Sequence, residues 1–153
     1  MARLTSWLER YIFVSWMILA GTGIIALYWA LDRSPPFVLG TYTVFNAPPG
    51  ETMFVTANVQ RAAERDCAVR FSRYLVDSNK VRHEIVPAGF MSATALRDLE
   101  REAPNQLRIA LRVPLAAAPG PGALVTNLEY QCNPLHSVWP IDVLLRMDIE
   151  VLR

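Results

Sequence analysis

A long run of apolar residues near the start of the chain extends from Tyr11 to Leu31 and contains no charged residue and no histidine. As an α-helix this run would extend about 32 Å, which matches the hydrocarbon core of a bilayer. A helix satisfies its backbone hydrogen bonds internally, which lipid cannot do for it. The run therefore predicts one transmembrane helix at 11–31, with residues 1–10 as a tail and residues 32–36 as a linker.

Aromatic and basic residues around the run indicate how it would lie in a membrane. Aromatic side chains suited to the two headgroup interfaces lie near both ends of the run: Tyr11, Trp16, Tyr28 and Trp29. Arg3 and Arg10 precede the run, whereas Arg33 is the single close basic residue after it. This bias favours a cytoplasmic N-terminus in the inner membrane and a periplasmic C-terminal domain.

Two alternatives concern the run itself. A cleaved signal peptide would need a small-x-small cleavage pattern, and none precedes Asp32. An uncleaved signal-anchor is therefore favoured. Thr22, Ala26 and Ala30 recur every four residues, a spacing that lets two membrane helices approach closely. A homo-oligomer formed through this stripe is the alternative to a monomeric anchor.

From Phe37 onward, apolar and polar residues alternate in short segments separated by turns rich in proline and glycine. Alternation with period two is typical of antiparallel strands that bury one face. The expected strands are Val38–Asn46, Met53–Val59, Cys67–Leu75, Lys80–Val86, Leu107–Val113, Leu124–Cys132 and Ile141–Val151. Ser92–Glu102 has helix-forming residues instead, and Pro104 would end that helix. Residues 37–153 are therefore expected to form a mainly β, antiparallel sandwich with one short inserted helix.

Composition narrows the function further. The 153 residues include 15 Lys and Arg against 14 Asp and Glu, so no global charge favours nucleic acid. The two cysteines, Cys67 and Cys132, are both in phase with apolar neighbours on expected strands. In an oxidising compartment such a pair is expected to form a disulfide. Closing this loop would stabilise the fold by up to about 4 kcal/mol in the chain-entropy model.

The alternative for the cysteines is a metal site. Cys132 and His136 are four residues apart, and Cys67 and His83 could supply further ligands for zinc or copper. Neither cysteine has a close CxxC partner, and Pro134 separates Cys132 from His136, so no metal and no other cofactor is expected. The chain also lacks a nucleophile elbow and a phosphate-binding glycine loop, and no catalytic residue is expected. His83 is expected on the surface and His136 as a hydrogen-bonding residue of its loop.

The residues before the second cysteine carry a family resemblance. Tyr130 lies two residues before Cys132 and follows the proline–glycine corner Ala118–Gly122. This arrangement resembles the tyrosine corner of immunoglobulin-like sandwiches, and the cysteine spacing is similar too. The resemblance covers Phe37–Arg153 and implies an immunoglobulin-like β-sandwich, although no tryptophan lies between the cysteines. The whole layout is similar to small uncharacterised membrane-anchored proteins of tailed phages and bacteria.

Two features suggest a surface for a partner. Arg70 and Arg73 lie in a stretch of concentrated positive charge that could meet an acidic partner or anionic headgroups, and an ordinary solvated face is the alternative. Val138 and Trp139 lie between two prolines, and an exposed tryptophan is a typical interface anchor. The alternative for Trp139 is packing over the end of the sandwich.

These patterns predict a non-enzymatic module for interaction or assembly, anchored in the bilayer and contacting other membrane or envelope proteins. The alternative is a periplasmic module that binds a small ligand or a metal. A membrane-bound enzyme is the third reading.

Overall fold

The computed structural model describes residues 2–61, 66–95 and 106–153, which fall into two compact units. The first unit ends at Arg33 and contains a single helix, α1, at Ala2–Leu31. Within it, Arg10–Leu31 is long and apolar enough to cross a membrane, and none of its apolar window is buried. The helix begins at Ala2, before the expected Tyr11, so the residues expected as a tail before the apolar run are also helical.

The second unit, Ser34–Arg153, contains the strands. Their bounds, together with one short 3-10 helix, are β1 Phe37–Phe45, β2 Thr52–Arg61, β3 Ala68–Val76, β4 Arg82–Met91, β5 Gln106–Arg112, β6 Gly120–Gln131, η1 Pro134–Ser137 and β7 Ile141–Val151. Pro36, which was expected in the linker, is already buried in this unit.

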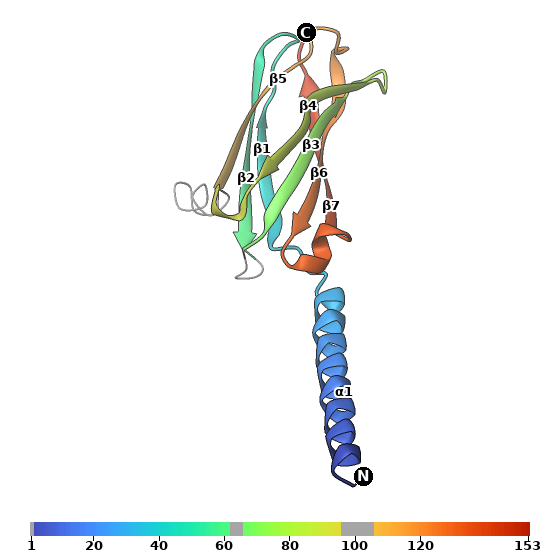
Figure 1. Cartoon of the computed structure of the whole chain (residues 1–153). Helices are drawn as coiled ribbons and strands as arrows, with labels where there is room; N and C mark the ends of the chain where they lie inside the picture. The colour runs from blue at the N-terminus through green and yellow to red at the C-terminus, as the bar shows by residue number, and fades with distance from the viewer. Residues whose placement is uncertain (1, 62–65, 96–105) are drawn as a thin grey trace. The chain divides into compact units, whose positions relative to one another are not determined.

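The strands form two antiparallel sheets (Figure 1). One sheet has the order β1-β2-β5, and the other has the order β4-β3-β6-β7. All pairs between neighbouring strands are antiparallel. The expected fold class, a mainly β antiparallel architecture after an N-terminal apolar helix, is confirmed. Of the helix expected at Ser92–Glu102, residues 93–95 are helical and those from 96 onward lie outside the described residues.

The inward faces of the two sheets supply a core in two clusters. The larger cluster includes Met53 and Val55 from β2 and Leu75, Leu124 and Met147 from the facing sheet. Full burial of one such side chain is worth roughly 1.5–3 kcal/mol. The smaller cluster lies at the other end of β3 and β6. It contains four buried residues with Phe37 packed against them: Cys67, Val69, Tyr130 and Ile141.

β4 extends further than the alternation predicted. The expected strand ended at Val86, whereas the observed strand continues through Pro87 and Gly89 to Met91. An edge strand tolerates proline because its outer N–H groups need no partner in the sheet. The register between β3 and β4 shifts on either side of Arg73. A Cβ at Gly89 would lie only 2.5 Å from the Phe71 ring, so a larger residue there would have to displace that ring.

Candidate interaction surface at the disulfide end

Cys67 and Cys132 form a disulfide at one end of the four-stranded sheet. Cys67 directly precedes β3 and Cys132 directly follows β6. Ala68 and Gln131 are register partners, so the cysteines are the next opposite pair. Their Cα atoms are 4.1 Å apart. The predicted disulfide is confirmed, and it joins neighbouring strands of one sheet, whereas that of antibody domains bridges two sheets.

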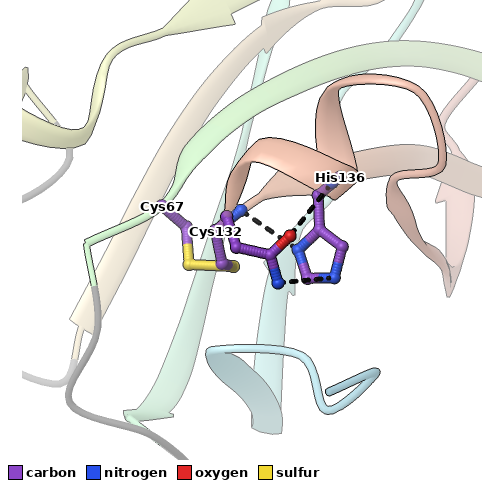
Figure 2. Close-up of a disulfide and its surroundings, with 4 residues drawn as sticks. Cys67, Cys132 and His136 are labelled. Atoms are coloured by element: carbon purple, nitrogen blue, oxygen red, sulfur yellow. Dashed lines mark hydrogen bonds between the residues drawn. A yellow bond between two sulfur atoms is a disulfide. The ribbon is translucent and has the colours of Figure 1, made fainter. Parts of the chain in front are cut away.

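The turn after Cys132 is built around a buried histidine (Figure 2). Asn133 caps η1, with its side-chain oxygen accepting a hydrogen bond from the His136 N–H at 3.1 Å. The Cys132 N–H donates to Nδ1 of His136 at 3.3 Å, and the side-chain amide of Asn133 lies 3.2 Å from Nε2. His136 is only 1% exposed. The expected role of His136 as a hydrogen-bonding residue of this loop is confirmed.

This same turn presents two large apolar side chains to solvent. Val138 is 86% exposed and Trp139 is 56% exposed. The N–H groups of both residues donate to the Leu135 carbonyl, which holds their backbone against η1. Trp139 thus keeps more than half of its surface exposed while making contacts of its own. An exposed tryptophan on a well-bonded backbone is suited to binding a partner.

The two arginines of the expected partner surface have different surroundings. Arg70 is exposed on β3, and its guanidinium lies 3.8 Å from Glu129. Arg73 is half-buried on the core-facing side, 5.0 Å from the centre of the Phe71 ring. Burial lowers the pKa of Arg73, and its buried Nε atom has no hydrogen-bond partner among the described residues. Thr126, its register partner on β6, likewise has an unpaired buried hydroxyl. Of these two arginines, Arg70 is the one whose charge lies on the exposed face of the sheet.

Tyr130 belongs to the small core cluster beneath this surface. Its ring centre lies 6.4 Å from that of Phe37, and burial raises its pKa to about 12. Tyr130 is the last residue but one of β6, whereas the tyrosine corner of immunoglobulin domains lies near the start of its strand. The ring thus serves to cover the disulfide end of the core.

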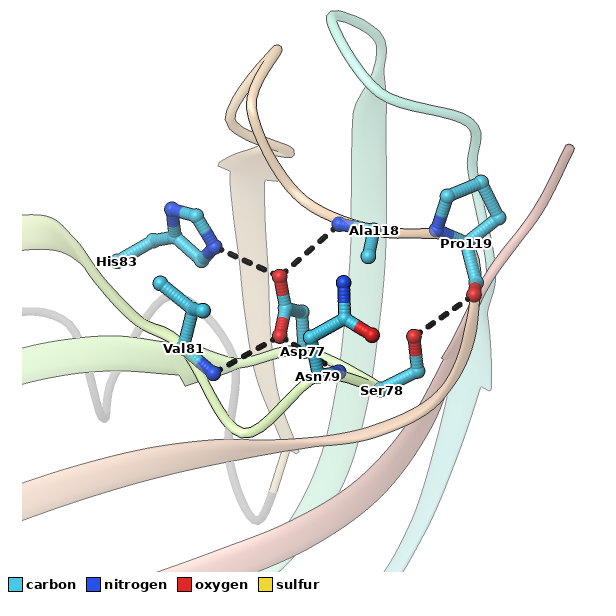
Figure 3. A network of polar contacts seen from close by, with 7 residues as sticks. All are labelled: Asp77, Ser78, Asn79, Val81, His83, Ala118 and Pro119. Carbon is cyan, nitrogen blue, oxygen red and sulfur yellow. Dashed lines mark hydrogen bonds and ion pairs between the residues drawn. The ribbon is translucent and has the colours of Figure 1, made fainter.

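A second polar network lies at the far end of β3 and was not predicted from sequence (Figure 3). Asp77 is 2% exposed and accepts hydrogen bonds from the N–H groups of Asn79, Val81 and Ala118, at 2.9–3.0 Å. Nε2 of His83 lies 3.0 Å from its second oxygen. The Ala118 bond, followed by the bond to His83, holds the pKa of this carboxyl well below its usual range.

This network ties the β3–β4 turn to the segment that leads into β6. The signal for it was the Asp77–Asn79 turn sequence, because aspartate side chains commonly accept from the backbone two residues on. His83 differs from its expected place on the surface, since its side chain is 13% exposed and bonded to a buried carboxylate.

The candidate metal ligands are engaged in other contacts. The two cysteine sulfurs are bonded to each other, His83 contacts Asp77, and His136 contacts the Cys132 backbone. Within residues 2–61, 66–95 and 106–153, no group of three His, Cys, Asp or Glu side chains is arranged to hold a metal ion. The sequence matches no known family model and no curated protein.

Proposed function

We propose that this protein is a non-enzymatic, membrane-anchored module for interaction or assembly, a subunit of a bacterial or phage-encoded envelope complex. In this proposal α1 spans the inner membrane with its N-terminus in the cytoplasm, and the sandwich lies in the periplasm. The sandwich is immunoglobulin-like, with its three-stranded and four-stranded sheets as support. The exposed pair Val138 and Trp139 contacts the partner protein.

The observation that carries the proposal is a contrast within the turn after Cys132, between a backbone held in place and exposed apolar side chains. Its backbone is fixed by the Asn133 cap, the buried His136 and the disulfide, so little entropy is lost when it binds. Two of its exposed side chains, Val138 and Trp139, are nonetheless large and apolar. Tryptophan is one of the residue types most enriched among those that dominate the binding energy of protein interfaces.

Two further features support the proposed setting. A disulfide persists in the periplasm and is rare in the bacterial cytoplasm, which agrees with the bias of Arg3 and Arg10. The chain between Leu31 and Phe37 can extend at most about 20 Å. Phe37 packs on the same core cluster as Cys132, so the linker joins the sandwich at the end that carries the turn after Cys132. The proposed partner is therefore a membrane protein or one held at the membrane surface.

The interaction is tested by affinity recovery of the tagged full chain from detergent-solubilised native membranes. Loss of a central tryptophan anchor typically costs 2 kcal/mol or more, so Trp139→Ala should lower partner recovery about 30-fold. Leu115→Ala is the matched control, because Leu115 is 80% exposed on the loop between β5 and β6. Equal recovery with both variants, or recovery of no specific protein by the unchanged chain, would overturn the proposal.

The orientation is tested separately with protease added to intact spheroplasts. Digestion of the sandwich with protection of an epitope placed before α1 is the expected result. Digestion of the epitope with protection of the sandwich would reverse the assignment. This measurement does not depend on whether a partner has been found.

A further inference from the structure

β7 is an edge strand whose outer edge is covered along only half of its length. The Asp148 N–H donates to the Tyr42 hydroxyl at 3.2 Å, and the Glu150 N–H donates to the Asn46 side chain at 3.0 Å. The Leu152 N–H then donates to a carbonyl just after β1, at 3.2 Å. β1 and the turn after it therefore cover the C-terminal half of this edge.

The N-terminal half of the same edge is open. The N–H groups of Asp148 and Glu150 point away from β6, and β7 pairs with β6 without a register shift. The other even-numbered residues of β7 therefore also direct their N–H and C=O groups away from β6. For Asp142, Leu144 and Arg146, no hydrogen bond along this edge is found among the described residues. All three side chains are exposed, and Leu144 is 66% exposed. An open edge with an exposed leucine is a template for strand pairing.

The other edge of this sheet is protected. β4 contains Pro87, which has no N–H to donate, and its pairing with β3 is irregular around Arg73. Strand addition to the four-stranded sheet is therefore favoured at β7.

The open segment is complementary to itself. In an antiparallel pair centred on Leu144, Asp142 lies opposite Arg146 of a second copy, and Leu144 lies opposite its own counterpart. Each opposite pair would exchange two hydrogen bonds, which satisfies every open N–H and C=O of these residues. Opposite charges and apolar side chains stabilise strands when they lie directly across from each other. In the part of the chain that the structure describes, the competing contact of Arg146 is a weak one, 3.8 Å from the exposed Asp148.

We propose that β7 residues 142–146 pair with the same residues of a second copy, so that two sandwiches share one continuous sheet. Three opposite residue pairs make a small interface by the standards of stable dimers. The proposal therefore rests on the membrane anchoring of the proposed function, because confinement in a bilayer raises the effective concentration of the copies. The surface used is distinct from Val138 and Trp139.

The pairing is tested in native membranes with the full chain carrying Leu144→Cys. Opposite residues of a hydrogen-bonded antiparallel pair have Cα atoms about 5.5 Å apart, which suits a disulfide. Leu144→Cys should therefore give a dimer on non-reducing electrophoresis. Leu115→Cys, an equally exposed cysteine elsewhere, is the control. Dimer no more abundant with Leu144→Cys than with this control would overturn the proposal.

Charge exchange distinguishes a second copy from any other partner strand. With Leu144→Cys present, Asp142→Arg should lower the dimer fraction at least 5-fold, because arginines then face each other. Adding Arg146→Asp restores both opposite-charge pairs and should restore the dimer. If this variant unfolds at the same temperature as the unchanged chain but the dimer is not restored, the edge does not pair with itself. Recovery of the Trp139-dependent partner in the same membranes shows whether the proposed function survives that result.

Discussion

Removal of the Cys67–Cys132 cross-link should destabilise the sandwich by a calculable amount. The sequence separation of 65 residues gives a loss of about 4 kcal/mol, because the unfolded chain regains its loop entropy. In a domain of about 120 residues, 1 kcal/mol shifts the melting temperature by about 4 °C, so reduction should lower Tm by about 15 °C. Cys67→Ala with Cys132→Ala should cost about 1 kcal/mol more, since Cys67 is buried and its sulfur fills core volume.

The measurement is thermal unfolding of the detergent-solubilised full chain, followed by near-ultraviolet circular dichroism. Comparing the oxidised chain, the reduced chain and the double alanine variant separates the cross-link from the packing of the sulfurs. The reasoning is refuted if reduction lowers Tm by less than about 4 °C. The residual structure of the unfolded chain, rather than its loop entropy, would then set the effect of the cross-link.

Three further changes test other parts of the structure. The pKa of Asp77 is lowered in the fold, so the stability that its ionised carboxyl contributes is complete above about pH 4 and is lost as pH falls further. Asp77→Asn should therefore flatten the acid side of a curve of Tm against pH. The raised pKa of Tyr130 predicts loss of stability as pH rises above about 10, and Tyr130→Phe should remove a tyrosine that titrates near pH 12 in ultraviolet absorbance. Gly122→Ala should lower the free energy of unfolding by about 1–3 kcal/mol, because the added Cβ would lie 2.5 Å from the Val76 carbonyl oxygen. Gly23→Ala is the control in the same thermal unfolding measurement, since a Cβ there meets open space and should leave sandwich stability unchanged.

Alternation identified the strands well where one face is buried and the other is charged. For Ile141–Val151 the predicted and observed bounds coincide, because Asp142, Arg146, Asp148 and Glu150 alternate with core residues. The disulfide was also predictable, since both cysteines are in phase with apolar neighbours. Pattern failed at β4, where Pro87 and Gly89 usually end a strand but an edge position and a packed ring accommodate them.

The polar contacts were less predictable because they join residues distant in sequence. Asp77 is buried only because Ala118 supplies an N–H from another loop. His136 was correctly expected to bond within its loop, but its burial depends on how the turn folds over the end of the sandwich. Arg73 was expected on a surface by its charge, yet the register of β3 with β6 directs it toward the core. The pattern of a single sequence contains no signal for contacts between residues that lie far apart along the chain.

The disulfide lies within one sheet, and this placement has a mechanical consequence. Tension between the anchor and a bound partner would enter the sandwich at Phe37, the first residue of β1. β1 lies outside the covalent loop closed by Cys67 and Cys132 and is held by its ladder with β2, by packing of Phe37 on the small core cluster and by the bond from β7 to Tyr42. Under load, β1 would detach first while β3 and β6 stay clamped. The domain would thus lengthen the tether before it lost the sheet that carries the turn at Trp139.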